Sequence, residues 1–265
     1  MRVFVLGSRG MLGHVVARAV TERGHEVVTS DERYGGSPRD PLIEAVRSSG
    51  CPAVFNCLGS TKRREQDLPE LYRANAQLPA HLAARVRANQ HIIHASTDCV
   101  FDGHRGNYRV DDEPTADDPY GFSKRLGETI SGRPNVTILR VSIIGPDYRP
   151  HKRGLLAWFL SSPTKVEGYT NWRWNGITTL EWAGVALEVI ERRHRGEPLA
   201  PVLQPATKPI SKYELLLKFR DAYRTSHEIG PVAAPTPIDR TLVPTEARPP
   251  IDEQLIRLRE WYAEC

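Results

Sequence analysis

The sequence lacks several features that would assign it to particular classes of protein. Its 265 residues include four cysteines, whose positions match neither a metal-ligand spacing nor a disulfide framework. No apolar run approaches the ~20 residues that a membrane-spanning helix needs, and the chain shows no basic leader, signal-peptide core or internal repeat. We therefore expect a cytoplasmic protein with reduced thiols, no metal site and no membrane partner.

Neither sign of charge is in large excess. The 36 Lys and Arg residues against 32 Asp and Glu residues give a formal net charge of +4 at pH 7. The basic residues are spread along the chain, which is not the clustered pattern of a nucleic-acid-binding protein. A mildly positive charge suits an anionic small molecule. The length suffices for one large domain, or one domain with an appended lobe, around a full hydrophobic core.

The first motif is a glycine-rich turn between a buried strand and an amphipathic helix. Residues 3–6 are a short apolar run, which is typical of a strand buried on both faces. From Met11 onward, apolar residues recur at helical spacing. Such a turn lets backbone N–H groups and a helix N-terminus meet a pyrophosphate, so it predicts a dinucleotide-binding site. Its candidate contact residues are Gly7, Arg9, Gly10, Met11, Leu12 and Gly13.

The next two predicted strands end in further candidate cofactor contacts. Asp31 and Arg33 follow the strand at 26–29. An acid at this point holds the adenosine ribose of NAD, whereas a base holds the 2′-phosphate of NADP. Asp31 favours NAD, while Arg9 and Arg33 favour NADP, and we expect NADP(H) with NAD(H) as the alternative. The third strand, at 53–55, leads into the remaining candidates, Cys57, Leu58 and Gly59.

The candidate catalytic residues come from the fourth predicted strand and a later helix. Thr97 follows the strand at 91–95, at the strand end where open α/β sheets bind ligands. A polar loop then leads to a helix that begins at Asp118. Tyr120 and Lys124 lie four residues apart and so share one helical face. A nearby ammonium favours the phenolate, so we expect Lys124 to lower the pKa of Tyr120 and help it exchange a proton.

Other patterns define helices around this region. Residues 69–89 carry one long helical pattern, and we expect Asn75 inside it to be a solvated polar residue. Capping boxes predict helix starts after Thr178 and Ser211, and Asp252 predicts the cap of a last helix.

These motifs together resemble the extended short-chain dehydrogenase/reductases, and most of all the dTDP-4-dehydrorhamnose reductase branch, which are sugar-nucleotide 4-ketoreductases. The resemblance rests on the glycine turn, the block from Ser96 to Gly103, the Tyr120-x-x-x-Lys124 pair and the segment from Trp174 to Thr179. It covers residues 1–195, whereas residues 196–265 match only in general character.

The resemblance implies an α/β fold, with a Rossmann-type doubly wound parallel sheet and a small C-terminal substrate-binding lobe. Residues 1–145 would form the dinucleotide-binding domain, with the helix at 179–195 packing back on it. Residues 146–178 and 196–265 would form the lobe.

The resemblance also implies a reaction, the reduction by NAD(P)H of the 4-keto group of a nucleotide-linked 4-keto-6-deoxysugar in deoxysugar or polysaccharide biosynthesis. Thr97 would hold the carbonyl oxygen, Tyr120 would donate the proton, and Lys124 would hold the nicotinamide ribose. The nucleotide sugar is the expected partner, and a homodimer is left open. Basic residues after 146 would face the diphosphate, with a solvated loop as the alternative. An aromatic and polar cluster would stack on a base or sugar, with a packing cluster as the alternative. The candidate substrate contacts are Thr97, Asp98, Arg149, Lys152, Arg153, Trp172, Trp174 and Asn175.

Cys99 departs from this branch, which typically has Tyr at that position, and from the related dehydratases, which have Glu. It is similar to GDP-fucose synthase, an epimerase–reductase that uses a Cys there as acid or base. Cys99 is therefore a further candidate catalytic residue, although its only candidate His partner, His151, fits poorly in spacing. The other interpretation is a small buried thiol. An alternative of another class is a non-catalytic nucleotide-binding regulatory subunit, against which the intact Thr97, Tyr120 and Lys124 argue.

Overall fold

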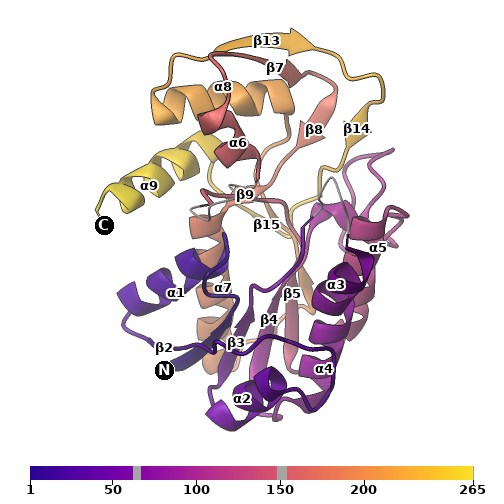
Figure 1. The fold of residues 1–265 in the computed structure, drawn as a ribbon, viewed down its shortest axis with the longest axis vertical. Coiled ribbons are helices and arrows are strands. Elements are labelled where there is room, and N and C mark those ends of the chain that lie inside the picture. Colours follow the sequence, from indigo (N-terminus) through magenta and orange to yellow (C-terminus); the bar gives the residue numbers. More distant parts are fainter. Residues whose placement is uncertain (62–66, 148–153, 265) are drawn as a thin grey trace.

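The computed structural model describes residues 1–61, 67–147 and 154–264, and a six-stranded parallel sheet forms its lower half (Figure 1). The strands of this sheet are β1 (Arg2–Leu6), β2 (Glu26–Val28), β3 (Ala53–Asn56), β4 (His91–Ala95), β5 (Val136–Leu139) and β10 (Val202–Leu203). Their order is β10-β5-β4-β3-β1-β2. The chain leaves β1 toward β2 and returns to β3 on the other side, so the topological switch point lies between β1 and β3. The predicted doubly wound α/β fold is confirmed.

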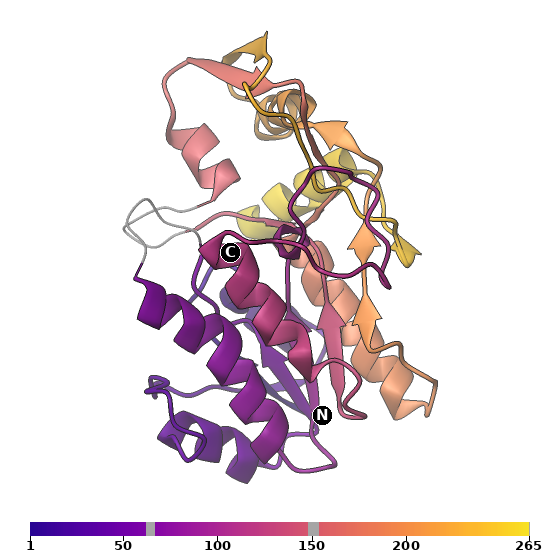
Figure 2. The same cartoon turned by 90° about the vertical axis from the view of Figure 1, so that its right-hand side faces the viewer.

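Helices cover both faces of the sheet, which is why its strands are continuous apolar runs (Figure 2). Side chains alternate along β1, so Val3 and Val5 pack on one face and Phe4 and Leu6 on the other. The first face is covered by α1 (Gly13–Glu22) and α7 (Thr179–His194), which contact each other. The second face is covered by α2 (Pro41–Ser49) and α4 (Leu78–Arg85).

The prediction of one long helix at 69–89 is wrong in one respect, because a π-helical turn interrupts the helix. The segment consists of α3 (Leu68–Tyr72), a π-helical turn η1 (Arg73–Gln77) and α4. A π-turn inserts one extra residue and often marks a functional site. Here it places Asn75 in the interior, 1% exposed, so the expected solvated residue is buried.

A second group of elements lies above the carboxyl ends of the sheet strands (Figure 1). It contains α6 (Leu155–Ser161), β7 (Lys165–Tyr169), β8 (Trp172–Trp174), β12 (Ile210–Ser211), α8 (Lys212–Tyr223), β13 (Glu228–Val232), β14 (Ile238–Asp239) and α9 (Ile251–Ala263). These elements share a separate core that includes Phe159, Trp174, Phe219 and Leu255. The division into a domain at 1–145 and a lobe at 146–178 and 196–265 stays a prediction.

Two of the predicted helix caps need correction. The capping box of Ser211 and Glu214 is confirmed at the start of α8. Thr178 caps α7 through the Glu181 backbone N–H, but the Glu181 side chain pairs with Arg248 and Arg257 instead of completing a box. The last helix begins one residue before Asp252, so this residue lies in its first turn and is not its cap.

The polar loop before Tyr120 is held by the C-terminal part of the chain. Backbone hydrogen bonds join Asp239 N to Gly103 O at 2.7 Å, Tyr108 N to Thr241 O at 2.9 Å and Val243 N to Tyr108 O at 2.8 Å. The remaining short elements are η2 (Asp98–Val100), α5 (Pro119–Gly127), η3 (Glu128–Ile130), β6 (Ile143–Ile144), β9 (Ile177–Thr178), β11 (Pro205–Ala206) and β15 (Glu246–Ala247).

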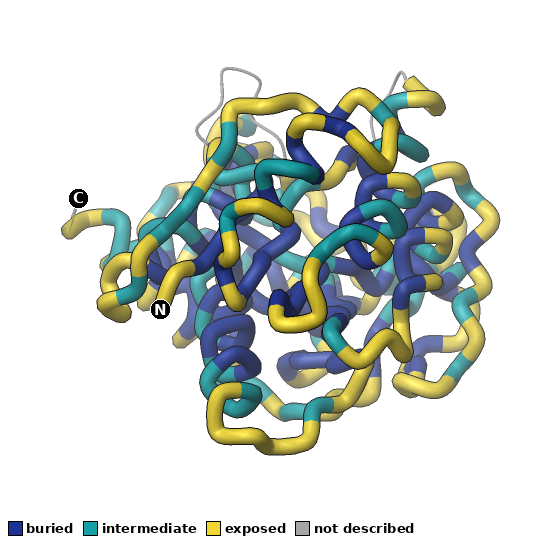
Figure 3. Tube along the Cα trace, turned by 90° about the horizontal axis from the view of Figure 1, so that it is seen from below, coloured by how far each residue is buried: buried dark blue, intermediate teal, exposed yellow. Residues whose placement is uncertain are grey.

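Buried segments form the interior of the sheet and its helices, and the exposed turns run around them (Figure 3). Among the described residues, none of the helices has both the length and the apolar character needed to cross a membrane.

Candidate active site

The glycine turn after β1 leaves no space for side chains at two positions. Gly7 has a φ of +74°, and a Cβ there would lie 3.0 Å from the backbone of Leu58, beyond the end of β3. A Cβ on Gly13 would overlap the carbonyl oxygen of Gly7. The turn is closed by a 2.8 Å hydrogen bond from Gly10 N to Gly7 O. This tight turn at the switch point fits a dinucleotide pyrophosphate, because backbone N–H groups can approach it closely.

Two of the three residues predicted to select the cofactor contact each other. The Arg9 guanidinium forms an ion pair with the Asp31 carboxylate, and both side chains are 83% exposed. Arg33 is also exposed. The remaining candidates follow the tight turn and β3: Met11 precedes the buried Leu12, and Gly59 lies against the Asn75 side chain.

Thr97 and Tyr120 meet at the carboxyl end of β4. Thr97 caps η2, accepting a hydrogen bond from Cys99 N at 3.2 Å and donating one to Asp98 Oδ1 at 3.0 Å. Helix α5 packs directly on η2, since a Cβ on Gly121 would overlap the carbonyl oxygen of Cys99. This close approach brings the Tyr120 side chain near enough to Thr97 for the hydroxyl to influence its pKa.

The pKa values of the predicted pair differ from the expectation. Burial raises the pKa of Tyr120, and the nearby Thr97 hydroxyl offsets this only in part. Burial also lowers the pKa of Lys124 to about 8, against an opposing effect of Glu128. The Lys124 ammonium donates a 2.7 Å hydrogen bond to the carbonyl of Ala95. The phenol is therefore protonated at neutral pH, as a proton donor must be, and the predicted lowering of its pKa is not observed.

A buried ion pair lies directly after the C-terminal end of α5. Glu128 and Arg140 have side chains that are 6% and 5% exposed and are joined at 2.7 Å. Ser96 donates a 2.5 Å hydrogen bond to Glu128, and Arg140 also donates to Gln204 Oε1 at 3.1 Å. Ser96 and Gln204 directly follow β4 and β10, and Arg140 also donates to Val110 O in the polar loop at 3.2 Å, so the pair joins the end of α5 to the sheet and to this loop.

Asn75 is a functional candidate that the sequence interpretation missed. Its amide donates to Ser60 O at 2.9 Å and Ser123 Oγ at 3.0 Å, and accepts from Ser60 N at 2.9 Å. It therefore joins the loop after β3 to α5. The available signal was its position four residues after Leu71 and three before Leu78, on the apolar face of the helical pattern.

The aromatic cluster of the upper group is well packed. Trp174 is 2% exposed and belongs to the core. Asn175 donates to Leu242 O at 2.8 Å and Thr207 O at 3.3 Å, and accepts from Leu242 N. Trp172 donates to Thr236 O at 2.9 Å and its ring contacts Tyr169. These contacts fit the alternative of a packing cluster, and the substrate contacts stay predictions.

The remaining candidates divide into residues beside Thr97 and residues that cannot be placed. Asp98 is buried and Cys99 is half-buried in η2. Burial first, and then the Asp98 charge, raise the pKa of the Cys99 thiol to about 12. Lys212 and Arg240 belong to the upper group and interact electrostatically with these η2 residues. The sequence interpretation did not single out either of them. Arg149, Lys152, Arg153 and His151 lie outside the described residues.

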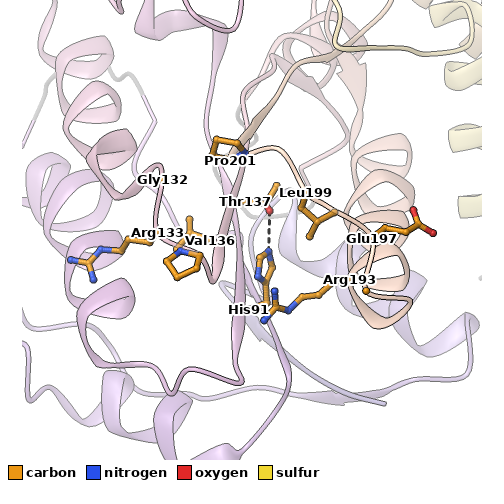
Figure 4. Close-up of a pocket in the computed structure, with 11 residues that line it drawn as sticks. His91, Gly132, Arg133, Val136, Thr137, Arg193, Glu197, Leu199 and Pro201 are labelled. Carbon is orange, nitrogen blue, oxygen red and sulfur yellow. Dashed lines mark hydrogen bonds between the residues drawn. The ribbon is translucent and has the colours of Figure 1, made fainter.

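A separate cavity of about 380 Å³ lies at the opposite end of the sheet (Figure 4). Its lining includes the first residue of β4, His91, whose ring is bonded to Thr137 at 2.9 Å. Burial, and then the charge of Arg193, lower the pKa of His91 to about 4. Ligands of open α/β sheets bind at the carboxyl ends of the strands, so this cavity is not the candidate active site. Within the described ranges, no group of three or more His, Cys, Asp or Glu side chains could hold a metal ion.

The fold has close relatives among solved structures. A hypothetical dTDP-4-dehydrorhamnose reductase from Sulfolobus tokodaii superposes with a TM-score of 0.76 at 25% identity, covering 95% of this chain and 98% of that one. A dTDP-4-dehydrorhamnose reductase from Bacillus anthracis, solved in complex with NADP, superposes with a TM-score of 0.80 at 17% identity, covering 100% and 99%. At this identity the second likeness shows the fold alone.

Sequence comparison gives a family. The probable low-salt glycan biosynthesis reductase Agl14 of Haloferax volcanii is 36% identical over 162 residues, which are 54% of this chain and 54% of that protein. The chain thus matches about half the length of such curated relatives. A family described as the RmlD substrate binding domain matches residues 1–261. The match extends over nearly the whole chain, which therefore belongs to the RmlD substrate binding domain family.

Proposed function

We propose that this protein reduces the 4-keto group of a nucleotide-linked 4-keto-6-deoxysugar with NADPH, in deoxysugar or polysaccharide biosynthesis. The observation that carries the proposal is the proximity of Thr97 and the protonated Tyr120 at the carboxyl end of β4, where Lys124 is bonded to Ala95. The Haloferax relative, a probable glycan biosynthesis reductase, and the Sulfolobus relative, a hypothetical dTDP-4-dehydrorhamnose reductase, support the same class of substrate.

Each of the three residues has a distinct task in this proposal. The Thr97 hydroxyl, which lies near the phenol, orients the substrate carbonyl oxygen toward it. Tyr120 donates its proton to that oxygen as negative charge develops on it. Lys124 holds the ribose and keeps a positive charge below the phenol. A bound nicotinamide cofactor supplies the hydride.

The preference for NADPH rests on the contact of Arg9 with Asp31. A free carboxylate at Asp31 would repel a 2′-phosphate, whereas its pairing with Arg9 neutralises this charge. The exposed guanidinium groups of Arg9 and Arg33 then remain at the rim of the adenosine site as partners for a phosphate.

The two alternatives have less support. An epimerase that uses Cys99 as a base needs its thiolate, and a thiol with a pKa of about 12 is almost entirely protonated at neutral pH. A non-catalytic regulatory subunit has no use for a buried, desolvated lysine such as Lys124, which lowers stability unless the site requires it.

The finer parts of the proposal concern the substrate contacts, the cellular location and the assembly of the protein. Arg149, Lys152 and Arg153 are proposed to face the diphosphate, and Trp172 the base or sugar. A cytoplasmic location agrees with the free thiols of Cys51, Cys57 and Cys99. A homodimer would be recognised by light scattering of the purified chain.

The decisive experiment is NADPH oxidation measured with a panel of nucleotide-linked 4-keto sugars. We expect turnover with at least one sugar and faster turnover with NADPH than with NADH. No NADPH consumption with any sugar would overturn the reductase assignment. Deuterium incorporation from solvent beside the ketone, lost in Cys99→Ser, would instead support the epimerase.

A further inference from the structure

Lys212 occupies a position that helix stability does not explain. It is the first residue of α8, directly after the capping residue Ser211. The N-terminus of a helix carries a partial positive charge, so a lysine there is unfavourable and an acid is preferred. Such departures from local preference are most common at functional sites.

The Lys212 side chain folds back over the upper core toward the candidate active site. Its Nζ lies 5.2 Å from the centroid of the Trp174 ring, within the range of a cation–π contact. It is half-buried, and desolvation lowers the pKa of its ammonium to about 8. Within residues 1–61, 67–147 and 154–264, the ring of Trp174 is the contact recorded for this nitrogen, which has no ion pair or hydrogen bond there.

Charged groups of η2 and of the segment after β14 surround this ammonium. The Asp98 carboxylate acts on it electrostatically from η2, and the Arg240 guanidinium opposes this effect. Arg240 is held by the backbone carbonyls of Phe101 and Asp102 at 2.9 and 3.2 Å. On its own helix, the Glu214 carboxylate is occupied by Ser211. Lys212 therefore faces the turn that directly follows Thr97.

We propose that Lys212 is a specificity-determining residue that donates a hydrogen bond to a sugar hydroxyl next to the reacting ketone. This inference rests on the proposed function, because it concerns the same site. A hydroxyl group both donates and accepts hydrogen bonds, so it can accept from Lys212 and donate to the Asp98 carboxylate. A phosphate can only accept, and the Asp98 charge would repel it.

The desolvated ammonium gives this contact its selectivity. A half-buried ammonium without a protein acceptor depends on solvent for its hydrogen bonds, and a hydroxyl that enters the site replaces this solvent with a fixed acceptor. A substrate that lacks the hydroxyl makes neither the hydrogen bond with Lys212 nor the one with Asp98. Sites of this kind reject the deoxy analogue far more strongly than apolar pockets reject an extra methylene group.

The test compares two nucleotide-linked 4-keto sugars, one with and one without the hydroxyl beside the ketone. In the wild type we expect kcat/KM to favour the hydroxylated sugar by at least ~10-fold. In Lys212→Met we expect KM for that sugar to rise ~10-fold or more and the preference to disappear, with little change in kcat or in NADPH affinity. Lys212→Arg should retain most of the preference. Lys218→Met, on the same helix, is the matched control and should behave as the wild type.

Two outcomes would overturn the role of Lys212. One is an unchanged preference in Lys212→Met. The other is an equal loss of kcat/KM for both sugars in Lys212→Met and Lys212→Arg, which would indicate a purely structural role.

A second measurement does not depend on turnover. Acylation of Lys212 by an amine-reactive ester, followed by mass spectrometry, should be slowed by the hydroxylated nucleotide sugar and less by its deoxy analogue. Equal rates with and without both sugars would overturn the proposal, whether or not NADPH is consumed. An absence of NADPH consumption together with selective protection would instead refute the reductase and retain Lys212 as a binding residue.

Discussion

The ammonium of Lys124 donates a 2.7 Å hydrogen bond to the carbonyl oxygen of Ala95, the last residue of β4. This bond ties α5 to the strand that leads into Thr97. The two elements that supply the proposed catalytic hydroxyls are thus joined at the base of the site by a buried cation. Burial also lowers the pKa of Lys124 to about 8, so its charge changes within the range of pH that can be tested.

Lys124→Met should change how stability depends on pH. The folded-state pKa of Lys124 is about 8, below its ordinary value of 10.5, so the unfolded chain binds more protons between these values. The wild type therefore carries the desolvation cost below pH 8 and loses it as the pH rises toward 10.5. Urea unfolding from pH 7 to 10 should show the wild type gaining stability relative to Lys124→Met. A constant difference would show that the ammonium is not desolvated.

Glu128→Gln should destabilise the fold strongly, because it leaves the buried Arg140 charge without its partner. We expect a loss of ~3–5 kcal/mol in the free energy of unfolding. The matched control is Glu228→Gln, which removes an ion pair with Lys165 whose side chains are 72% and 80% exposed. Its effect should stay below ~1 kcal/mol. Similar losses in the two variants, measured by urea unfolding, would contradict the proposed support of α5.

Arg9→Ala should shift the cofactor preference toward NADH. The substitution removes a phosphate partner and leaves the Asp31 carboxylate unpaired. The loss of one charge-assisted hydrogen bond predicts a fall of ~10-fold or more in kcat/KM for NADPH. The ratio of kcat/KM for NADPH and NADH is the measurement, and Arg39→Ala, at another exposed arginine, is the control. An unchanged ratio would indicate that Arg33, and not Arg9, selects NADPH over NADH.

Asn75→Ala should loosen the junction between the loop after β3 and α5. The substitution leaves the backbone groups of Ser60 without their buried partners, which predicts a loss of ~2–3 kcal/mol. Asn89→Ala, at an exposed position, should change stability by less than ~0.5 kcal/mol. If the two variants unfold at the same urea concentration, the network around Asn75 contributes little.

The sequence pattern was sufficient to predict elements whose apolar residues repeat regularly within one segment of the chain. Strand β4 has the predicted bounds, because its apolar run is a local feature of the sequence. The π-turn around Asn75 is different, since its polar partners Ser60 and Ser123 are supplied by other elements. Lys212 could not be placed for the same reason: its contact with Trp174 and its position facing Asp98 exist only after α8 has packed.

The pKa of Tyr120 illustrates a further limit. Helical spacing correctly predicts that it shares a face with Lys124, but spacing carries no information on desolvation. Burial raises the pKa of Tyr120, and the nearby Asp98 and Asp118 charges raise it further. The sign of the shift depends on how closely α5 approaches η2, which is a tertiary contact through Gly121 and Cys99.

Tyr120→Phe tests the proposed proton donor directly. The substitution removes only the phenolic oxygen, so NADPH affinity, measured by fluorescence titration, should remain near that of the wild type. Loss of a positioned general acid predicts a fall of ~10²–10⁴-fold in kcat for the 4-keto sugar. Tyr169→Phe, at a side chain on β7 that is 39% exposed, is the matched control and should retain full activity. If Tyr120→Phe keeps wild-type turnover, the proton comes from another group, and Cys99→Ser in the same assay would show whether the thiol supplies it. Because the Tyr120 pKa is raised, loss of the phenolic proton should not limit wild-type kcat up to pH 9, and a change in kcat near pH 8 would instead reflect Lys124.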